Sequence, residues 1–267
     1  MSVAVDRLRA AGAAGVPVPV WLLVALAIAD VVLRLVIVLP NVSIGSLLTM
    51  LTGAAGPLLL AAVVLLVAPA RQFMLAGAVL LGAAGLADGL LRALNQPIAM
   101  HYLTVPDFVH VAGSLAIALA VVGGPILIAR EFGRAASPSA RLTIAVAAVI
   151  ALVLAVAVLD SWLQVAEQLG GAVSFIDVRL AASMITQFVI VSWAYVLVAA
   201  AQRRFRLIAG GAALMLAALL VVVAITVVGM LVQPVPGTSF GFVWDVANVL
   251  RIGAWLALIA GTLRDVS

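Results

Sequence analysis

The sequence predicts an all-α integral membrane protein, and composition, segment length and loop length are the three observations that predict it. Hydrophobic residues make up 67% of the 267 residues and charged residues 9%, whereas soluble domains contain roughly 45–50% and about 25%. The apolar residues form segments of about 20 residues, the length that crosses a hydrocarbon core roughly 30 Å thick. Short connections leave no room for a soluble domain between the segments. The composition therefore excludes soluble enzymes and disordered chains, and the absence of Cys excludes disulfide-bonded modules.

Eight segments meet this length requirement, which predicts eight membrane spans. Two of the connections, 95–106 and 233–241, contain Pro, with Gly in the second, as loops do. In chain order, the expected spans cover residues 18–39, 44–68, 72–94, 107–129, 141–165, 175–200, 207–232 and 242–263.

The first two spans each have a feature that needs an explanation. The first follows two arginines, but it is longer than the 7–15-residue core of a signal peptide, so we expect it to remain as a span. The second contains the run TGAAGP, in which Pro57 lacks an N–H and leaves the carbonyl of Gly53 without its helical donor. The sequence therefore predicts a kink, with Gly53, Gly56 and Pro57 as candidate hinge residues. A packing kink beside small residues is the alternative.

Acidic and basic side chains recur within the spans. Asp30 and Arg34 lie four residues apart in the first span, and Asp88 and Arg92 do so in the third, so each pair can meet on one helix face. Close helix contacts are expected at the glycines of the third, fourth and seventh spans. The other charges at or within spans are Asp107, Asp160, Asp177, Arg179, Asp245 and Arg251, and the glycines are Gly85, Gly89, Gly123, Gly124, Gly210 and Gly211.

The sequence contains arginine but no lysine, and the distribution of the arginines predicts the orientation. Ten of the 14 arginines fall on one side of the expected bundle. By the positive-inside rule this side is cytoplasmic, so both termini are expected in the cytoplasm and the protein in the plasma (inner) membrane. The same distribution explains the net charge of +4 without nucleic acid as a partner. The ten are Arg7, Arg9, Arg71, Arg130, Arg134, Arg141, Arg203, Arg204, Arg206 and Arg264.

The two halves of the chain match each other in order, which predicts two parallel four-helix repeats at 1–136 and 137–267. Four spans return the chain to its starting side, so a ligand site is expected between the halves. Chance similarity between Ala-, Leu- and Val-rich helices is the alternative, because only four of 24 positions in the last matching stretch are identical. The matching segments include 27–30 (AIAD) with 157–160 (AVLD), 71–73 (RQF) with 203–205 (RRF), and 108–131 with 242–265.

With this orientation, the intramembrane charges gather in the outer half of the membrane. A rise of 1.5 Å per residue places Asp30 and Arg251 about 13 Å below the outer boundary. The same rise places five shallower charges roughly 3–10 Å below it, namely Arg34, Asp88, Arg92, Asp160 and Asp245. The pattern predicts an outward-facing polar funnel with Asp30 and Arg251 at its floor. The candidate ligand- or ion-binding residues are Asp30, Arg34, Asp88, Arg92, Asp160, Asp245 and Arg251.

Two interpretations of these charges remain open. In the first, the Asp–Arg pairs neutralise each other and fix helix packing, a role that suits Arg. In the second, they line a solvated ligand pocket, because a charge in the bilayer costs at least about 2.5–3.5 kcal/mol and these charges come from several spans on one side. With Glu167, which lies just beyond the fifth span, seven carboxylates and four arginines give a net charge of −3, which favours a cationic or zwitterionic ligand.

Motifs for cofactors are absent from the sequence. It contains no P-loop, dinucleotide fingerprint, GxSxG or HExxH motif, so no cofactor is expected. His101 and His110, with Asp107 three residues before His110, are weak candidates for a haem or metal site or for pH sensing.

These observations favour a small permease, or the membrane subunit of a transport system, that binds a small cationic or zwitterionic ligand or protons between its halves. Neutralising Asp30 is then expected to abolish coupling while folding persists. A non-catalytic sensor or accessory subunit that recognises another membrane protein is the second hypothesis. An enzyme acting on a lipid or cofactor at the outer leaflet is the third, and it requires a carboxylate pair such as Asp30 with Asp88. Expected partners are the lipid bilayer and a membrane protein or second copy of the chain.

Overall fold

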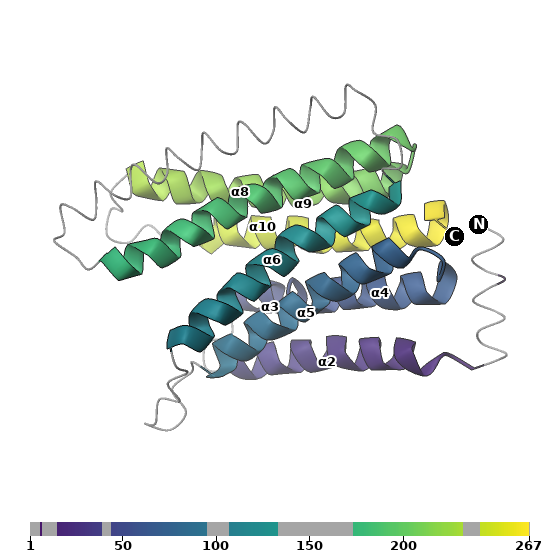
Figure 1. Cartoon of the computed structure of the whole chain (residues 1–267), viewed down its shortest axis with the longest axis horizontal. Coiled ribbons are helices and arrows are strands. Elements are labelled where there is room, and N and C mark those ends of the chain that lie inside the picture. The colour runs from purple at the N-terminus through teal and green to yellow at the C-terminus, as the bar shows by residue number, and fades with distance from the viewer. Residues whose placement is uncertain are drawn as a thin grey trace.

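The computed structural model describes residues 15–38, 44–94, 107–132, 173–231 and 241–266, together with Asp6, and within these ranges the fold is helical and contains no strand. Figure 1 shows a bundle of elongated helices in which α2 to α5 lie on one side and α8 to α10 on the other, with α6 between them. The helices are α2 (Val18–Val38), α3 (Ile44–Leu51), α4 (Ala55–Val67), α5 (Gln72–Leu94), α6 (Asp107–Phe132), α8 (Val173–Gln202), α9 (Arg206–Leu231), α10 (Gly241–Gly261) and the π-helical turn η2 (Thr262–Val266).

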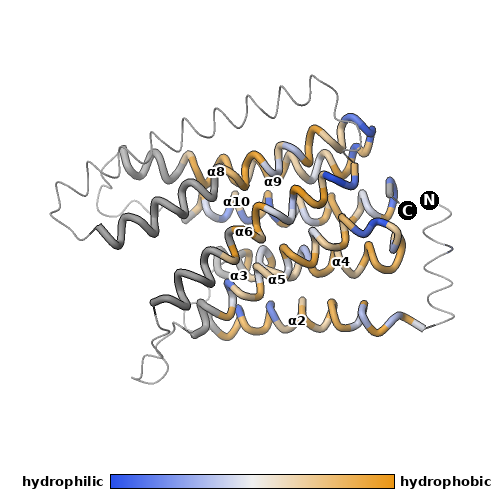
Figure 2. The backbone as a smooth tube through the Cα atoms, viewed as in Figure 1, coloured by the Kyte–Doolittle hydropathy of each residue, from blue (hydrophilic) through white to orange (hydrophobic). Residues whose placement is uncertain are grey.

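Four helices in the described ranges are long and apolar enough to cross a membrane, which supports a multi-pass membrane protein. Their outward side chains are apolar: Trp21, Leu220 and Leu256 are 60%, 53% and 62% exposed. Such side chains suit contact with lipid rather than with water. Figure 2 shows hydrophobic residues along the helices and hydrophilic residues gathered where the C-terminus lies. The four segments are Val18–Val36, Gln72–Leu90, Arg206–Ala224 and Phe242–Asp265.

Helices occupy most of the predicted spans nearly to the residue. The third span was expected at 72–94, and α5 has these bounds; α2, α6, α8, α9 and α10 begin and end within three residues of their predicted limits. The boundaries were predictable because Arg, Pro and polar residues interrupt the apolar runs at the membrane surface. The span expected at 141–165 lies outside the described residues.

The second predicted span consists of two helices rather than one kinked helix. α3 ends at Leu51 and α4 begins at Ala55, with a turn at residues 52–54. Pro57 therefore lies in the first turn of α4, where its missing N–H removes no helical hydrogen bond. The break thus precedes the proline by three residues or more, instead of bending the helix at Pro57.

Gly53 and Gly56, at this break, allow close packing. Neither has a positive φ, so the turn does not depend on a left-handed glycine conformation. A Cβ atom at Gly53 would overlap the guanidinium of Arg34, and one at Gly56 would overlap the indole of Trp255. Both glycines therefore bring the broken helix against side chains of α2 and α10.

One end of the bundle, which we call the basic end, holds the start of α2, the α4–α5 and α8–α9 connections, the end of α6 and η2 (Figure 1). Arg71 Nη1 lies 3.3 Å from Glu131 Oε1, joining the start of α5 to the end of α6. Arg203 Nε donates to the carbonyl of Phe132 at 2.9 Å. The backbone N–H of Leu207 donates to Asp265 Oδ2 at 3.3 Å. Arginines that the sequence assigns to one side therefore lie at one end of the bundle.

Small residues let neighbouring helices approach closely. A Cβ atom at Gly77 of α5 would lie 2.5 Å from the carbonyl oxygen of Gly124 in α6, and one at Gly211 of α9 would lie 2.9 Å from that of Ala254 in α10. These contacts match the expectation for membrane helices. Gly210 differs: among the described residues, nothing lies within 4 Å of a Cβ placed there.

The larger of the two apolar core clusters among the described residues extends from one half of the bundle to the other. It includes Leu60 and Ile128 from the first half and Ile208 and Leu258 from the second, all fully buried. α6 packs against α8, and α10 packs against both α3 and α4. The two halves are therefore held together by the contact of α6 with α8 and by the contact of α10 with the broken second span. The candidate site lies between these helices.

Candidate functional site in a cavity between the halves

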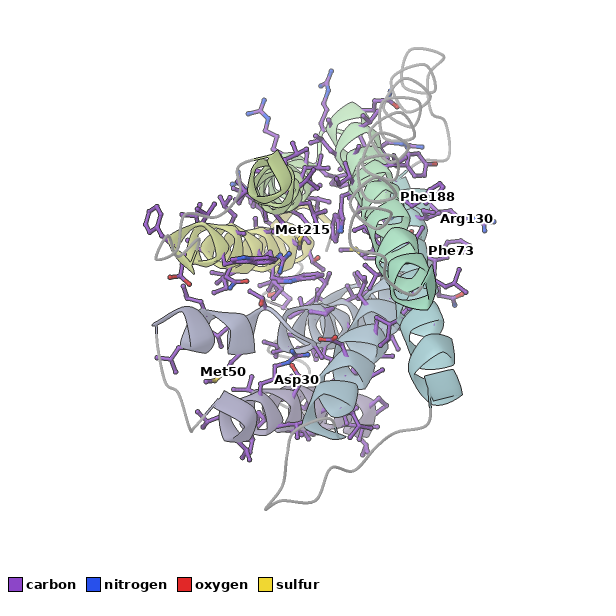
Figure 3. The ribbon with its side chains drawn as sticks, turned by 90° about the vertical axis from the view of Figure 1, so that its left-hand side faces the viewer. Asp30, Met50, Phe73, Arg130, Phe188 and Met215 are labelled. Carbon is purple, nitrogen blue, oxygen red and sulfur yellow. The ribbon has the colours of Figure 1, made fainter. Side chains whose placement is uncertain are left out.

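The polar centre of the bundle begins with an ion pair on α2, in which one N–H group is shared between two carboxylate oxygens. Arg34 Nε donates to Asp30 Oδ1 at 3.0 Å and to Oδ2 at 3.1 Å. The side chain of Asp30 is fully buried and that of Arg34 is 9% exposed. The i,i+4 spacing brings the two groups onto one helix face, as the sequence predicts. Figure 3, seen along the bundle, shows Asp30 pointing from α2 into the interior.

Arg34 continues this network to α5. Its Nη2 atom donates to the carbonyl of Gly85 at 2.7 Å, and its Nη1 atom lies 3.6 Å from Asp88 Oδ2. Gly89 leaves room for the pair, because a Cβ there would lie 3.1 Å from Asp30 Oδ1. Arg34 therefore lies between two carboxylates and also binds the backbone of α5.

Asp30 also secures the start of α4. The backbone N–H of Ala54 donates to Asp30 Oδ2 at 2.8 Å. Ala54 is the N-cap of α4 and has no side chain that can cap the helix. A carboxylate at a helix N-terminus satisfies a free N–H and interacts favourably with the helix dipole. Asp30 thus supplies, from another helix, the cap that the broken span lacks.

A cavity of about 290 Å³ lies beside this network and is lined from both halves of the chain. Three lining residues are ionisable, namely Arg34, Asp88 and Arg251, and Asp30 lies behind Arg34 without lining the cavity. The sequence places Asp30 at the floor of a funnel; in the structure it is enclosed. Apolar residues make most of the wall, among them Pro57, Leu81, Val121, Val189, Trp193, Met215, Leu219 and Trp255. Figure 3 shows Met215 on the opposite side of the interior from Asp30.

One face of α10 closes the cavity on the side of the second half. Asn248, Arg251 and Trp255 are three and four residues apart, so they form a stripe along the helix. Thr52 Oγ1 donates to Asn248 Oδ1 at 3.5 Å, and Trp255 packs against Gly56. The stripe therefore faces the break between α3 and α4, and Arg251 lies between its two points of contact.

Arg251 differs from Arg34 in its partners. Within the described ranges, no carboxylate lies within 4.0 Å of its guanidinium, and no hydrogen bond to it is present. Its side chain lines the cavity among Trp193, Trp255 and Leu219. A guanidinium has five N–H donors that require acceptors. Among the described residues, the donors of Arg251 therefore have no protein acceptor.

The structure brings only some of the predicted site residues together. Asp30, Arg34, Asp88 and Arg251 meet at the network and cavity. Asp245 is half-buried in α10 but does not line the cavity; it lies six residues before Arg251, on a different helix face. The predicted residues whose side chains lie outside the described part of the chain are Arg92, His101, Asp107, His110 and Asp160.

Sequence reasoning missed the apolar wall and the contacts at the break. Trp193 and Trp255 meet edge to face, with ring centroids 5.9 Å apart, and join α8 to α10 beside the cavity. The stripe of Asn248, Arg251 and Trp255 was available as a signal in the sequence. Trp193 gave no such signal, because a Trp within an apolar span has many packing roles.

Comparison with known proteins adds no family to this description. Neither a protein family, nor a curated protein, nor a solved structure matches the chain.

Proposed function

We propose that this protein is a small membrane permease, or the membrane subunit of a transport system, whose ligand binds in the cavity between the two halves. The observation that carries the proposal is that Asp88 and Arg251, from opposite halves, line the same cavity. Charged residues within a membrane are costly and commonly mark substrate or ion pathways. The cavity volume of about 290 Å³ suits a small ligand, since sites for drug-sized molecules measure roughly 300–1,000 Å³.

The proposal divides the charges into two groups with different roles. Asp30 and Arg34 hold α2, α4 and α5 together, and this part of the network fits a packing role. Asp88 is 37% exposed at its side chain, and Arg251 has no carboxylate partner among the described residues. Asp88 and Arg251 are therefore the ligand-facing charges, with Arg34 orienting Asp88.

An arrangement of eight spans in two parallel repeats is part of the proposal. Contacts between the halves support it, because α4 packs against α10 and α8 packs against α6. Each of these contacts joins the second span of one proposed repeat to the fourth span of the other. Glu131 contacts Arg71 at the start of α5, and Asp265 contacts Leu207 at the start of α9. α6 ends at the basic end and α8 begins at the other end (Figure 1). In the proposed arrangement, the span expected at 141–165 connects them and is the eighth.

In the proposed orientation, the basic end lies on the cytoplasmic side of a bacterial-type inner membrane. The arginines at this end, including Arg71, Arg203 and Arg264, support it through the positive-inside rule. Asp88 then lies in the outer half of the membrane, 16 residues into α5 from Gln72. We therefore propose that the cavity opens toward the outer surface, because Asp88 lines it.

The enzyme hypothesis receives less support from this geometry. It needs Asp30 and Asp88 to act together on a substrate proton. Arg34 lies between these carboxylates and binds both of them, and Asp30 is fully buried. A shared proton between the two acids is therefore disfavoured.

The test uses the full chain purified into lipid nanodiscs and proteoliposomes. Small amines, zwitterions and acids are screened for thermal stabilisation, and those that bind are then tested for uptake. The proposal expects saturable stabilisation that Arg251→Gln reduces and that the matched variant Arg264→Gln leaves unchanged, because Arg264 is 73% exposed and distant from the cavity. Binding without uptake would replace transport by a ligand-sensing role. Absence of binding by every probe, together with constant co-purification of one membrane protein, would replace it by the accessory-subunit hypothesis.

A further inference from the structure

We infer that the ligand of this cavity is a small zwitterion with an apolar body, whose acid group binds Arg251 and whose ammonium group binds Asp88. The inference rests on the proposed function and specifies the ligand class for the same site. The sequence alone favours cations as much as zwitterions, because it counts every carboxylate in the outer half. Of these charged residues, only Arg34, Asp88 and Arg251 line the cavity in the described part of the chain.

The described charges around the cavity balance each other. Asp30 and Asp88 contribute two negative charges, and Arg34 and Arg251 contribute two positive ones, so the described charges cancel. A ligand with a single charge would add an uncompensated charge to an apolar site, where Coulomb interactions are strong. A zwitterion leaves the total charge at zero. Neutrality therefore favours a ligand that carries both signs.

The positive and negative groups assigned to the ligand, Arg251 and Asp88, lie on different halves of the chain. Arg34 already pairs with Asp30 and Asp88, so an acid group of the ligand would compete with two carboxylates there. Arg251 makes no ion pair with the described residues. A guanidinium binds a carboxylate or phosphate through two parallel hydrogen bonds. The acid group of the ligand is therefore assigned to Arg251.

The two carboxylates differ in their access to the cavity. Asp30 accepts hydrogen bonds at 2.8 to 3.1 Å from Arg34 and Ala54 and is closed to the cavity. Asp88 lies 3.6 Å from Arg34, lines the cavity and is 37% exposed. A ligand ammonium can approach Asp88 without breaking the cap of α4. The amine is therefore assigned to Asp88.

The remaining wall predicts the body of the ligand. Trp193, Trp255, Val189, Met215 and Leu219 present apolar surface from α8, α9 and α10. Apolar area buried against such a wall stabilises binding by roughly 25 cal/mol per Å². A polar body such as a sugar would leave its hydroxyl groups without partners there. An aliphatic or aromatic body of amino-acid size suits both the surface and the volume.

The experiment compares probes that differ only in their charges. Leucine carries both groups, leucine methyl ester lacks the acid, and 4-methylpentanoate lacks the amine. Binding of each to the full chain in nanodiscs is measured by calorimetry, together with 4-aminobutanoate and 6-aminohexanoate, which place the two charges further apart. The inference expects the best zwitterion to bind at least about tenfold more tightly than either single-charge analogue, as the loss of one charged hydrogen-bonded group predicts.

Two variants assign each charge to its residue. Arg251→Gln is expected to reduce zwitterion affinity about tenfold or more while leaving the ester unaffected, and Asp88→Asn is expected to reduce zwitterion affinity while leaving 4-methylpentanoate unaffected. Arg264→Gln and Asp6→Asn, which change exposed residues away from the cavity, serve as matched controls. Size-exclusion chromatography and thermal unfolding confirm that each variant is folded.

The outcomes separate the inference from the proposed function. If the ester binds as tightly as the zwitterions and Arg251→Gln has no effect, the ligand is a cation; the zwitterion assignment is then overturned while the proposed function stands. If 4-methylpentanoate alone binds, the ligand is an anion, with the same consequence. If no probe of any charge class binds, both the inference and the proposed function are overturned.

Discussion

Arg34 and Asp30 form a two-point contact within one turn of α2, with Nε of Arg34 3.0 Å and 3.1 Å from the two carboxylate oxygens of Asp30. The same carboxylate accepts the N–H of Ala54, and the same guanidinium donates to the carbonyl of Gly85. This pair therefore connects α2 to the break before α4 and to α5. It gives Asp30 a structural role, and the ligand contacts that we propose are made by Asp88 and Arg251.

Asp30→Asn is expected to destabilise the protein. The variant leaves the buried Arg34 with a neutral amide in place of its closest carboxylate, and loss of one partner of a buried ion pair costs about 3–5 kcal/mol. Thermal unfolding in detergent should therefore show a lower midpoint than for wild type, with Asp6→Asn, an exposed carboxylate, as the control. This expectation replaces the one drawn from the sequence, in which the variant folds normally. An unchanged midpoint for Asp30→Asn would refute the structural role.

Arg251→Leu is expected to have the opposite effect on stability. Its guanidinium has no carboxylate partner among the described residues and lies in a mostly apolar wall, so replacing it removes a poorly compensated charge. The unfolding midpoint should stay equal or rise, while ligand binding is lost. Residues kept for function often have this signature. A large fall in the midpoint would instead indicate that Arg251 stabilises the fold.

Gly85→Ala is expected to separate α5 from the broken span. A Cβ there would lie 2.7 Å from both N and Cα of Ala54, and this backbone cannot move without disturbing the bond between Ala54 and Asp30. We expect a loss of about 1–3 kcal/mol, as for other overpacked sites. Gly210→Ala is the matched control, because its Cβ would meet nothing within 4 Å among the described residues. Equal midpoints for the two variants would show that the α5 contact is not tight.

Sequence reasoning located the helices because a membrane span needs only enough apolar residues between polar boundaries. α5, for example, runs between Gln72 and Leu94 as predicted. The pairing of Asp30 with Arg34 was also predictable, since both residues are on one helix and their spacing determines whether they meet. These features depend on local sequence and not on how the helices are rotated against each other.

The cavity could not be predicted in the same way. The contact of Asp88 with Arg34 of another helix, and the position of Trp193 beside Trp255, depend on helix rotation and packing. The hydrophobic pattern does not determine rotation here, because residues on both the lipid-facing and the buried sides of a span are apolar. The two-helix form of the second span was also missed, although Pro57 marked the region.

Topology reporters are expected to place the basic end in the cytoplasm. A green fluorescent protein fused after Ser267 should fluoresce, and an alkaline phosphatase fused at the same position should be inactive. A phosphatase fused after Leu94, where α5 ends at the opposite end of the bundle, should be active. The expectation follows from the arginines at the basic end. The reverse pattern of reporter activities would invert the orientation and open the cavity toward the cytoplasm.

The absence of cysteine from the chain allows a direct test of whether the cavity holds water. Leu219 and Leu220 are adjacent on α9: Leu219 is 9% exposed and lines the cavity, whereas Leu220 is 53% exposed on the outer face of the helix. Each is replaced by Cys in the otherwise cysteine-free protein and treated in vesicles with a membrane-impermeant, thiol-specific reagent. The comparison measures solvent access at two neighbouring positions of the same helix.

The account predicts that Leu219→Cys reacts from the outer side, that a bound zwitterion slows this reaction, and that Leu220→Cys, which faces lipid, remains unreactive. A thiolate forms only where water reaches the side chain, so reactivity reports a wet cavity. Failure of Leu219→Cys to react from either side, in a folded protein, would show that the cavity is dry. The charges around it would then be structural, and the proposal that this protein binds a ligand between its halves would be wrong.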